Sequence, residues 1–311
     1  MLAIFEAILP IFLLVLLGIG LKRAPVFEQP FWDGLEKFGY YVLFPSLLFM
    51  SLSQADFARM ATGSVTAVTF SSVVLMSVLV LASWPLFRRS GVSPSSFTTI
   101  FQTATRWNAF MALAIAEKLA GANGLTVIAI IMAANILPIN VFNIGTLVWF
   151  NGGSRNPTAI LKRMATNPII LGAGAGVLVN LTGIELYDPV LVAVDLVSRS
   201  ALGLGLIMVG AGLKISDALK PHPAAIAGVV LKLLVFPMIM TGIGLLLGVQ
   251  GETLLLLALS GGVPTAMNGY LLAKQMGGDA PLYAAIATLQ TAAAFFTIPA
   301  ILWAVGQVAG G

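Results

Sequence analysis

The stretch SGGVPTAMNG, residues 260–269, interrupts an otherwise apolar segment that extends over residues 252–276. Pro264 has no backbone N–H to donate and its ring clashes with the preceding helical turn, and the glycines weaken a helix further. The backbone groups freed in this way would have the polar side chains of Ser260, Thr265 and Asn268 beside them. A kinked helix packed by small residues is the alternative, but we predict a true break.

The chain around this stretch is too apolar for a soluble protein. Of its 311 residues, 59% are hydrophobic and 9% are charged, whereas a soluble domain carries roughly 25% charged residues. A helix that crosses the ~30 Å hydrocarbon core needs about 20 apolar residues, so the length permits about ten crossings. We predict an all-α membrane protein with one membrane domain over residues 1–311. The net charge of +4 is attributed to loop lysines and arginines, and no nucleic-acid partner is expected.

Several kinds of chemistry lack the residues they need. The chain has no cysteine and one histidine, His222, which argues against disulfides, iron–sulfur clusters and structural zinc. An intramembrane aspartyl protease needs two membrane aspartates, and only Asp195 qualifies. A HExxH helix is absent, and His222 lies in an expected loop, away from any membrane serine. We therefore expect neither an enzyme nor a cofactor, while coupling to Na+ or H+ stays open.

The loop charges predict the orientation. The expected spans are 2–21, 35–53, 64–87, 96–120, 123–150, 167–184, 188–213, 222–249, 252–276 and 280–307. A cleavable signal peptide carries its positive charge before the apolar run, whereas here it follows the run. If the N-terminus is outside, ten basic residues lie in cytoplasmic loops and two in the opposite loops. The ten are Lys22, Arg23, Arg88, Arg89, Arg155, Lys162, Arg163, Lys214, Lys220 and Lys274, and the two are Arg59 and Lys118. We predict an even number of spans in the cell membrane (the inner membrane of a bacterium), with both termini outside the cytoplasm.

An internal repeat is indicated by pairs of similar residues at a nearly constant separation of 157 to 161 residues. The pairs are Pro10 and Pro168, Asn108 and Asn268, Pro138 and Pro299, and Gly121 and Gly278. The separation is close to half the chain length and predicts a duplication, with repeat one at 1–155 and repeat two at 160–311. Five spans per half is an odd number, so the second copy must be inverted. Inverted repeats are typical of secondary transporters.

Arg106 marks the span that we expect to cross the 252–276 segment. It lies in 96–120 at roughly 15 Å from the cytoplasmic side, close to the bilayer midplane. An arginine at that depth is a functional hypothesis by default. Either an anionic ligand or the carbonyls of a helix C-terminus would supply its partner. We favour a carboxylate ligand, with Thr105 and Asn108 beside it.

The other charges inside spans are Asp195, Arg199 and Lys232. Asp195 and Arg199 are four residues apart on one helix and are expected to form a structural ion pair. Lys232 has no acidic residue at helical spacing, and a structural role against backbone carbonyls is at least as well supported as a ligand role. The spans 64–150 and 222–307 have no deeply buried carboxylate, so proton coupling through an intramembrane Asp or Glu is not expected.

Polar side chains also follow two further spans. They are Asn135, Asn140 and Asn143 in 123–150, and Gln290, Thr291 and Thr297 in 280–307. They would either coordinate a cation or hold helices together, and we favour helix packing. The predicted substrate-binding set is Arg106, Asn108, Thr105, Pro264, Thr265, Asn268, Asn135, Asn140 and Gln290.

Several motifs occur in the order found in the auxin efflux carrier family, which the chain resembles over its whole length. They are Leu9-Pro10-Ile11-Phe12 with Gly18, Tyr41-Val42-Leu43-Phe44-Pro45-Ser46-Leu47-Leu48-Phe49, Arg106-Trp107-Asn108 through Ala112-Leu113-Ala114 to Gly121, Asn167-Pro168, Val263-Pro264-Thr265-Ala266 to Lys274, and Thr297-Ile298-Pro299. The bacterial branch of this family includes malonate-type carriers. Plant-type members have a proline at the crossing in the fourth span, where this chain has Ala114, and many have a longer loop near 151–166.

The resemblance implies a ten-helix fold of two inverted five-helix repeats, similar to bile acid:sodium symporters. Spans within 1–53 and 167–213 would form a scaffold that dimerises. Spans within 64–150 and 222–307 would form a moving, elevator-type transport domain in which the fourth and ninth spans cross as broken helices. The implied substrates are small organic anions such as auxin or dicarboxylates. A sodium-coupled symporter of the bile-acid-transporter type, with a different organic anion, is the alternative.

Overall fold

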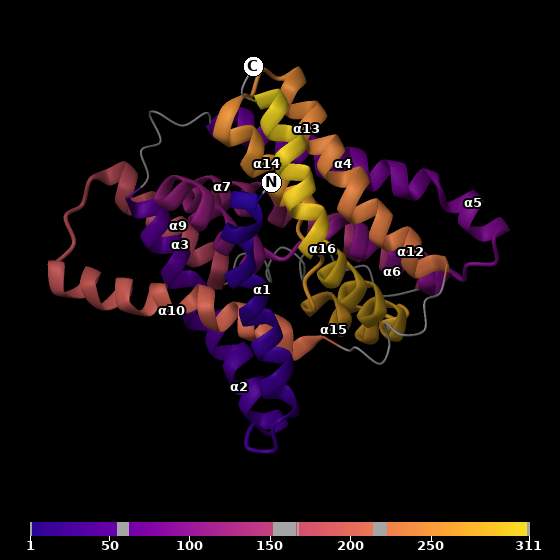
Figure 1. Ribbon diagram of the computed structural model, residues 1–311, viewed down its shortest axis with the longest axis horizontal. Coiled ribbons are helices and arrows are strands. Elements are labelled where there is room, and N and C mark those ends of the chain that lie inside the picture. The colour runs from indigo at the N-terminus through magenta and orange to yellow at the C-terminus, as the bar shows by residue number, and fades with distance from the viewer. Residues whose placement is uncertain (1, 55–61, 152–165, 167, 214–222, 310–311) are drawn as a thin grey trace.

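The computed structural model describes residues 2–54, 62–151, 166, 168–213 and 223–309, and its regular elements are all helices (Figure 1). The helices are α1 (Leu2–Arg23), α2 (Gln29–Phe38), η1 (Gly39–Leu43), α3 (Phe44–Ser53), α4 (Thr62–Ala82), α5 (Trp84–Arg89), α6 (Pro94–Thr105), α7 (Ala109–Asn151), α9 (Pro168–Thr182), α10 (Asp188–Gly212), α12 (Pro223–Val230), η2 (Leu231–Val235), α13 (Phe236–Leu246), α14 (Gly251–Gly262), α15 (Asn268–Gln275) and α16 (Ala280–Ala309). Each of the ten ranges predicted to cross a membrane contains helix.

The described helices have the length and composition of membrane helices. Five helical stretches are long and apolar enough to cross a bilayer, namely Thr62–Arg89, Pro94–Asn151, Asp188–Gly212, Pro223–Leu246 and Ala280–Val308. Within a helix the backbone hydrogen bonds are satisfied internally, as the hydrocarbon core requires. The prediction of an all-helical fold is therefore confirmed for the described residues, and the helices are consistent with a membrane protein. Of the loop charges that set the predicted orientation, six lie outside the described residues, as does His222: Arg59, Arg155, Lys162, Arg163, Lys214 and Lys220.

α7 is two helices joined at Gly121. This glycine has φ +54° and ψ −138°, a conformation that residues with a Cβ rarely adopt. Beyond the turn, a Cβ at Gly124 would overlap the carbonyl oxygen of Ala116, so the two segments approach closely. The expected turn between the spans 96–120 and 123–150 therefore lies at Gly121.

Two π-helices each precede a Phe-Pro pair. η1 is followed by Phe44 and Pro45, and η2 by Phe236 and Pro237. Proline cannot donate to the carbonyl four residues before it, and its ring clashes with that carbonyl. The helix widens just before the proline, so that the Phe44 N–H reaches the carbonyl of Gly39 and the Phe236 N–H reaches that of Leu231. Single π-turns of this kind are frequent at functional sites.

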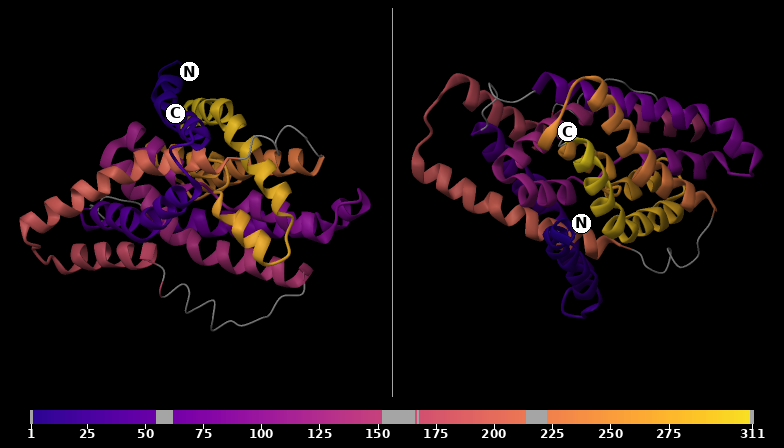
Figure 2. Two further views of the ribbon diagram at one scale, coloured as in Figure 1. Left: turned by 90° about the horizontal axis from the view of Figure 1, so that it is seen from below. Right: turned by 45° about the horizontal axis from the view of Figure 1, so that its top comes forward.

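The helices pack in two groups. The first packing group is residues 2–53 and 168–212, where α3 packs on α9 and α1 packs on α10. The second packing group is residues 62–151 and 223–309, where α13 and α16 each pack on α14, and α4 and α6 pack on α7. The groups meet chiefly where α1, α3 and α10 contact α7 and where α1 contacts α16. α10 begins at one end of the molecule and runs toward its middle, and α5 lies at the other end, in the view of Figure 1 and in both views of Figure 2.

Candidate functional site

The fourth expected span is broken although it contains no proline at the break. α6 ends at Thr105, Arg106 is extended with φ −72° and ψ 158°, and α7 begins at Ala109. Asn108 starts the second half, because its side-chain oxygen accepts a hydrogen bond from the N–H of Met111 over 3.2 Å. A capping asparagine of this kind satisfies one of the N–H groups that a helix start leaves free. The second half of the broken span therefore begins at Asn108.

The ninth expected span is also broken, which confirms the prediction from residues 260–269. α14 ends at Gly262, Val263 is extended with φ −69° and ψ 147°, and α15 begins at Asn268. The two breaks touch, because the Asn108 N–H donates to the carbonyl of Pro264 over 2.7 Å. The structure thus brings Arg106, Asn108, Pro264 and Thr265 together at one crossing.

Gln290 of α16 ties this crossing together. Its Oε1 accepts from the N–H of Thr265 over 2.8 Å. Its Nε2 donates to the carbonyl of Thr103 over 3.1 Å and to that of Gly228 over 2.9 Å. Gln290 is fully buried, and it satisfies backbone groups on α6, on α12 and in the second break. Helix packing, which the sequence analysis favoured for this residue, accounts for these bonds.

Tyr283 belongs to the crossing although the sequence analysis did not select it. Its hydroxyl donates to the carbonyl of Ala266 over 2.7 Å and lies 2.9 Å from Oγ1 of Thr265. A Cβ at Gly269 would overlap the Tyr283 hydroxyl, so the glycine makes room for the ring. A buried tyrosine in an apolar helix usually has a hydrogen-bond partner, and that was the signal available in the sequence.

Arg106 supplies the positive charge of the crossing. Its Nε atom is buried and has no hydrogen-bond partner among the described residues. Arg106 lies three residues before the start of α7, and the bond between Asn108 and Pro264 brings the segment that leads into α15 close to it. Helix starts present free N–H groups and a partial positive charge. An arginine with helix starts beside it suits a carboxylate or another anion.

The remaining predicted residues divide between packing and the crossing. Oγ1 of Thr105 donates to the carbonyl of Phe101 over 3.0 Å and accepts from Nδ2 of Asn143 over 3.1 Å, so both hold α6 against α7. Asn135 is buried, and its Oδ1 has no partner among the described residues. Asn140 is partly exposed on the same helix. Asn268 begins α15, but its side chain lies outside the described residues.

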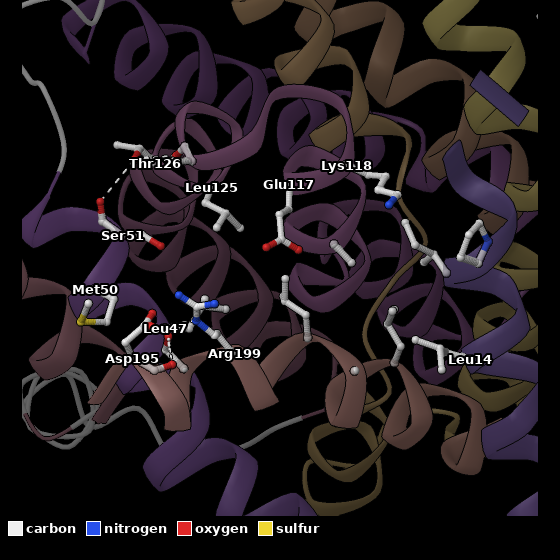
Figure 3. Close-up of a pocket in the computed structure, with 18 of the residues that line it drawn as sticks. Leu14, Leu47, Met50, Ser51, Glu117, Lys118, Leu125, Thr126, Asp195 and Arg199 are labelled. Atoms are coloured by element: carbon white, nitrogen blue, oxygen red, sulfur yellow. Dashed lines mark hydrogen bonds and ion pairs between the residues drawn. The ribbon is translucent and has the colours of Figure 1, made fainter. Parts of the chain in front are cut away.

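A cavity of about 660 Å³ lies between the two packing groups. Its walls come from α1, α3 and α10 on one side and from α7 on the other (Figure 3). None of the nine predicted site residues lines it. Four charged side chains do, and they are Glu117, Lys118, Asp195 and Arg199.

The cavity wall contains the predicted ion pair between Asp195 and Arg199. Nε of Arg199 lies 2.7 Å from Oδ2 of Asp195, and the arginine side chain is 75% exposed. The pairing is confirmed, but the pair faces the cavity and is not enclosed by helices. Figure 3 shows Glu117 of α7 pointing into the same space from the opposite wall.

Comparison with known proteins decides the family. The profile of the family described as "Membrane transport protein" matches residues 3–148 and 156–302. The chain belongs to this family. That finding confirms the resemblance to auxin efflux carriers and identifies a membrane transporter.

Relatives of this membrane transport protein cover its full length. An "Uncharacterized transporter" of Methanothermobacter thermautotrophicus is 26% identical over 304 residues, 96% of this chain and 97% of the relative. The "Uncharacterized transporter YfdV" of Escherichia coli K12 is 23% identical over 309 residues, 95% of each chain. The similarity to each relative therefore extends over nearly the whole of both chains.

Proposed function

We propose that this membrane transport protein is a secondary carrier of small organic anions, with mono- and dicarboxylates such as malonate or malate as substrates. The observation that carries the proposal is Arg106, a partly buried arginine at the contact of two broken helices. A charge at that depth in a membrane is costly unless it has a partner, and a carboxylate substrate provides one during transport.

The proposed anion site is the crossing itself. Arg106 would form charge-assisted hydrogen bonds to the carboxylate, which are roughly twice as strong as neutral ones. The N–H groups at the starts of α7 and α15 would add the partial positive charge of two helix starts. The Thr265 and Tyr283 side chains fix the backbone of the second break, so the donors are held in place before the substrate arrives.

Alternating access would come from movement of one packing group against the other. The first packing group is the proposed scaffold, within 1–53 and 167–213, and the second is the proposed transport domain, within 64–150 and 222–307. Packing within each group is more extensive than packing between them, and the cavity lies at their boundary. These features support an elevator-type movement of two inverted repeats, and dimerisation through the scaffold is part of the same proposal.

Thermal unfolding of the purified protein with a panel of carboxylates tests this function. We expect a dicarboxylate such as malonate to raise the melting temperature. Arg106→Ala is expected to weaken the apparent affinity by about tenfold or more, because a hydrogen bond to a charged group contributes about 1.5–3 kcal/mol. Arg88→Ala, which removes an exposed arginine at the end of α5, is the matched control. Unchanged anion affinity in a folded Arg106→Ala protein would refute the site.

Sodium-coupled symport of a different organic anion is the second candidate function. The buried Oδ1 of Asn135, which has no partner among the described residues, is the kind of oxygen that binds a cation. The same unfolding panel, repeated with choline in place of sodium, separates the two candidates. A requirement for sodium would favour the symporter.

A further inference from the structure

Lys232 is a buried lysine that the proposed anion site does not use. Its side chain is 0% exposed, and its Nζ has no hydrogen-bond partner among the described residues. Nζ lies 4.3 Å from the centroid of the Phe236 ring, which is a cation–π contact. The residue lies in the π-helix η2. A buried ammonium with one aromatic contact needs further negative charge around it.

The position of Lys232 along its helix is fixed by two contacts. Four residues earlier, Gly228 lies against α6, with a Cβ position 3.2 Å from Oγ1 of Thr103. Five residues later, Pro237 lies against α14, with its Cα 2.7 Å from the Cβ position of Gly261. Thr103 is in the last turn of α6 and Gly261 is in the last turn of α14. The backbone at Lys232 therefore lies between the C-terminal ends of α6 and α14, both of which contact η2, and within about 6 to 8 Å of each glycine contact along the helix axis.

Both of these helix ends have a last-turn carbonyl without its usual helical donor. At the end of α6, the Asn108 N–H goes to Pro264 and not to the carbonyl of Ala104. Pro264 has no N–H for the carbonyl of Ser260, and the Thr265 N–H goes to Gln290 and not to the carbonyl of Gly261. Each C-terminus carries a partial charge of about half an elementary charge, negative in sign. Two such ends together amount to about one negative charge, which one ammonium balances. Neither helix has a basic residue in its own last turn, and Arg106, which follows α6 directly, is the proposed partner of the substrate anion.

In sodium-coupled carriers with broken helices, carbonyls at unwound segments and half-helix C-termini bind the coupling cation. We propose that the ammonium of Lys232 is a built-in replacement for such a monovalent cation, so that substrate binding needs no sodium. The inference rests on the proposed carrier function and deepens it, because it decides between the two candidates. Lys232 belongs to the second packing group, which is the proposed transport domain. Its positive charge would therefore stay beside the two broken helices in both the outward-open and the inward-open state.

The experiment compares thermal unfolding in sodium chloride and in choline chloride, first without any anion and then with malonate. We expect the native protein to have the same melting temperature and the same malonate affinity in both salts. Lys232→Gln, which removes the charge, should be more stable in sodium than in choline. Its malonate affinity should become sodium-dependent by about fivefold or more, within the usual range of coupling between sites.

Two further variants separate charge from packing. Lys232→Arg keeps the positive charge and should be as indifferent to sodium as the native protein. Lys274→Gln removes an exposed lysine from α15 and should also respond equally to both salts. If Lys232→Gln is unstable in choline, recovery in sodium supports the proposal. Failure of Lys232→Gln and Lys232→Met to fold in either salt contradicts it.

The comparison of sodium with choline needs no substrate. It can therefore refute the role of Lys232 whether or not the protein carries anions. Absence of any response to carboxylates would refute the carrier proposal and leave the sodium result readable. Sodium stabilisation of the native protein, or equal stability of Lys232→Gln in both salts, would overturn the role of Lys232 even if malonate binds.

Discussion

The backbone N–H of Asn108 donates to the carbonyl of Pro264 over 2.7 Å, and this bond joins the breaks of two helices 156 residues apart in sequence. Backbone groups at membrane depth must be satisfied within the protein. The first break therefore supplies a backbone donor, and the second break supplies the carbonyl that accepts its hydrogen bond. The crossing is a shared structure, and a change at one break is expected to affect both.

Gln290→Leu is expected to destabilise the crossing from a third helix. The substitution removes three buried hydrogen bonds, to Thr265, Thr103 and Gly228. Interhelical bonds in membranes average about 0.6 kcal/mol, so the free energy of unfolding should fall by about 2 kcal/mol. Thermal or denaturant unfolding in lipid nanodiscs measures the change. Gln250→Leu is the control, since Gln250 is exposed and its side chain makes no capping bond; equal losses would contradict the prediction.

Tyr283→Phe is expected to loosen the second break while keeping the aromatic ring. The hydroxyl contacts the carbonyl of Ala266 and Oγ1 of Thr265. Their loss should cost about 1 kcal/mol of stability and should weaken malonate binding, because the segment that presents the anion site is less well held. Unfolding scans with and without malonate report both effects. Tyr187→Phe, at a residue that is 76% exposed, should leave both unchanged, and the prediction fails if the two variants behave alike.

Much of the helix order was predictable from the sequence, because a long apolar segment that crosses the hydrocarbon core must form a helix to satisfy its backbone hydrogen bonds. The break at Pro264 was also predictable, since proline and glycine act locally. The break at Arg106 had no such local signal. It depends on the capping bond of Asn108 and on the contact with Pro264, and the second of these is a tertiary interaction.

The sequence predicted Arg106, Pro264, Thr265 and Gln290 as members of the candidate site, but it did not predict Tyr283. Arg106 is conspicuous because arginine is rare at membrane depth. Tyr283 has an ordinary position in an apolar helix, and only the folded structure shows that its hydroxyl meets Thr265. The cavity was also unforeseen, because its lining comes from four helices distant in sequence. The pattern of one helix does not contain that information.

Gly210→Ala is expected to separate α1 from α10. A Cβ at Gly210 would overlap the backbone carbonyl oxygen of Val15, and a backbone atom cannot rotate away. Overpacking of this kind typically costs about 1–3 kcal/mol. Gly203→Ala on the same helix meets nothing within 4 Å and should be neutral or slightly stabilising, because alanine favours a helix over glycine. Thermal unfolding compares the two, and a smaller loss for Gly210→Ala than for Gly203→Ala would refute this packing.

Ser51→Cys is expected to make the cavity chemically visible from outside the cell. The chain has no cysteine, so one introduced thiol gives an unambiguous signal. Ser51 lines the cavity near the end of α3, and the predicted orientation places that end of the span at the outer face. A membrane-impermeant maleimide should therefore label Ser51→Cys in intact cells, since a water-exposed thiol forms the reactive thiolate.

The matched control for this labelling is Ser72→Cys. Ser72 is fully buried in α4 and donates to the carbonyl of Val68 over 2.6 Å, so the reagent should not reach a thiol there. Labelling of both variants would show that the helices open enough to admit the reagent anywhere. Labelling of Ser51→Cys only in inside-out vesicles would reverse the predicted orientation and place the cavity on the cytoplasmic side. Labelling of Ser51→Cys in intact cells, without labelling of Ser72→Cys, would place the cavity between α7 and the first packing group on the outer face of the membrane.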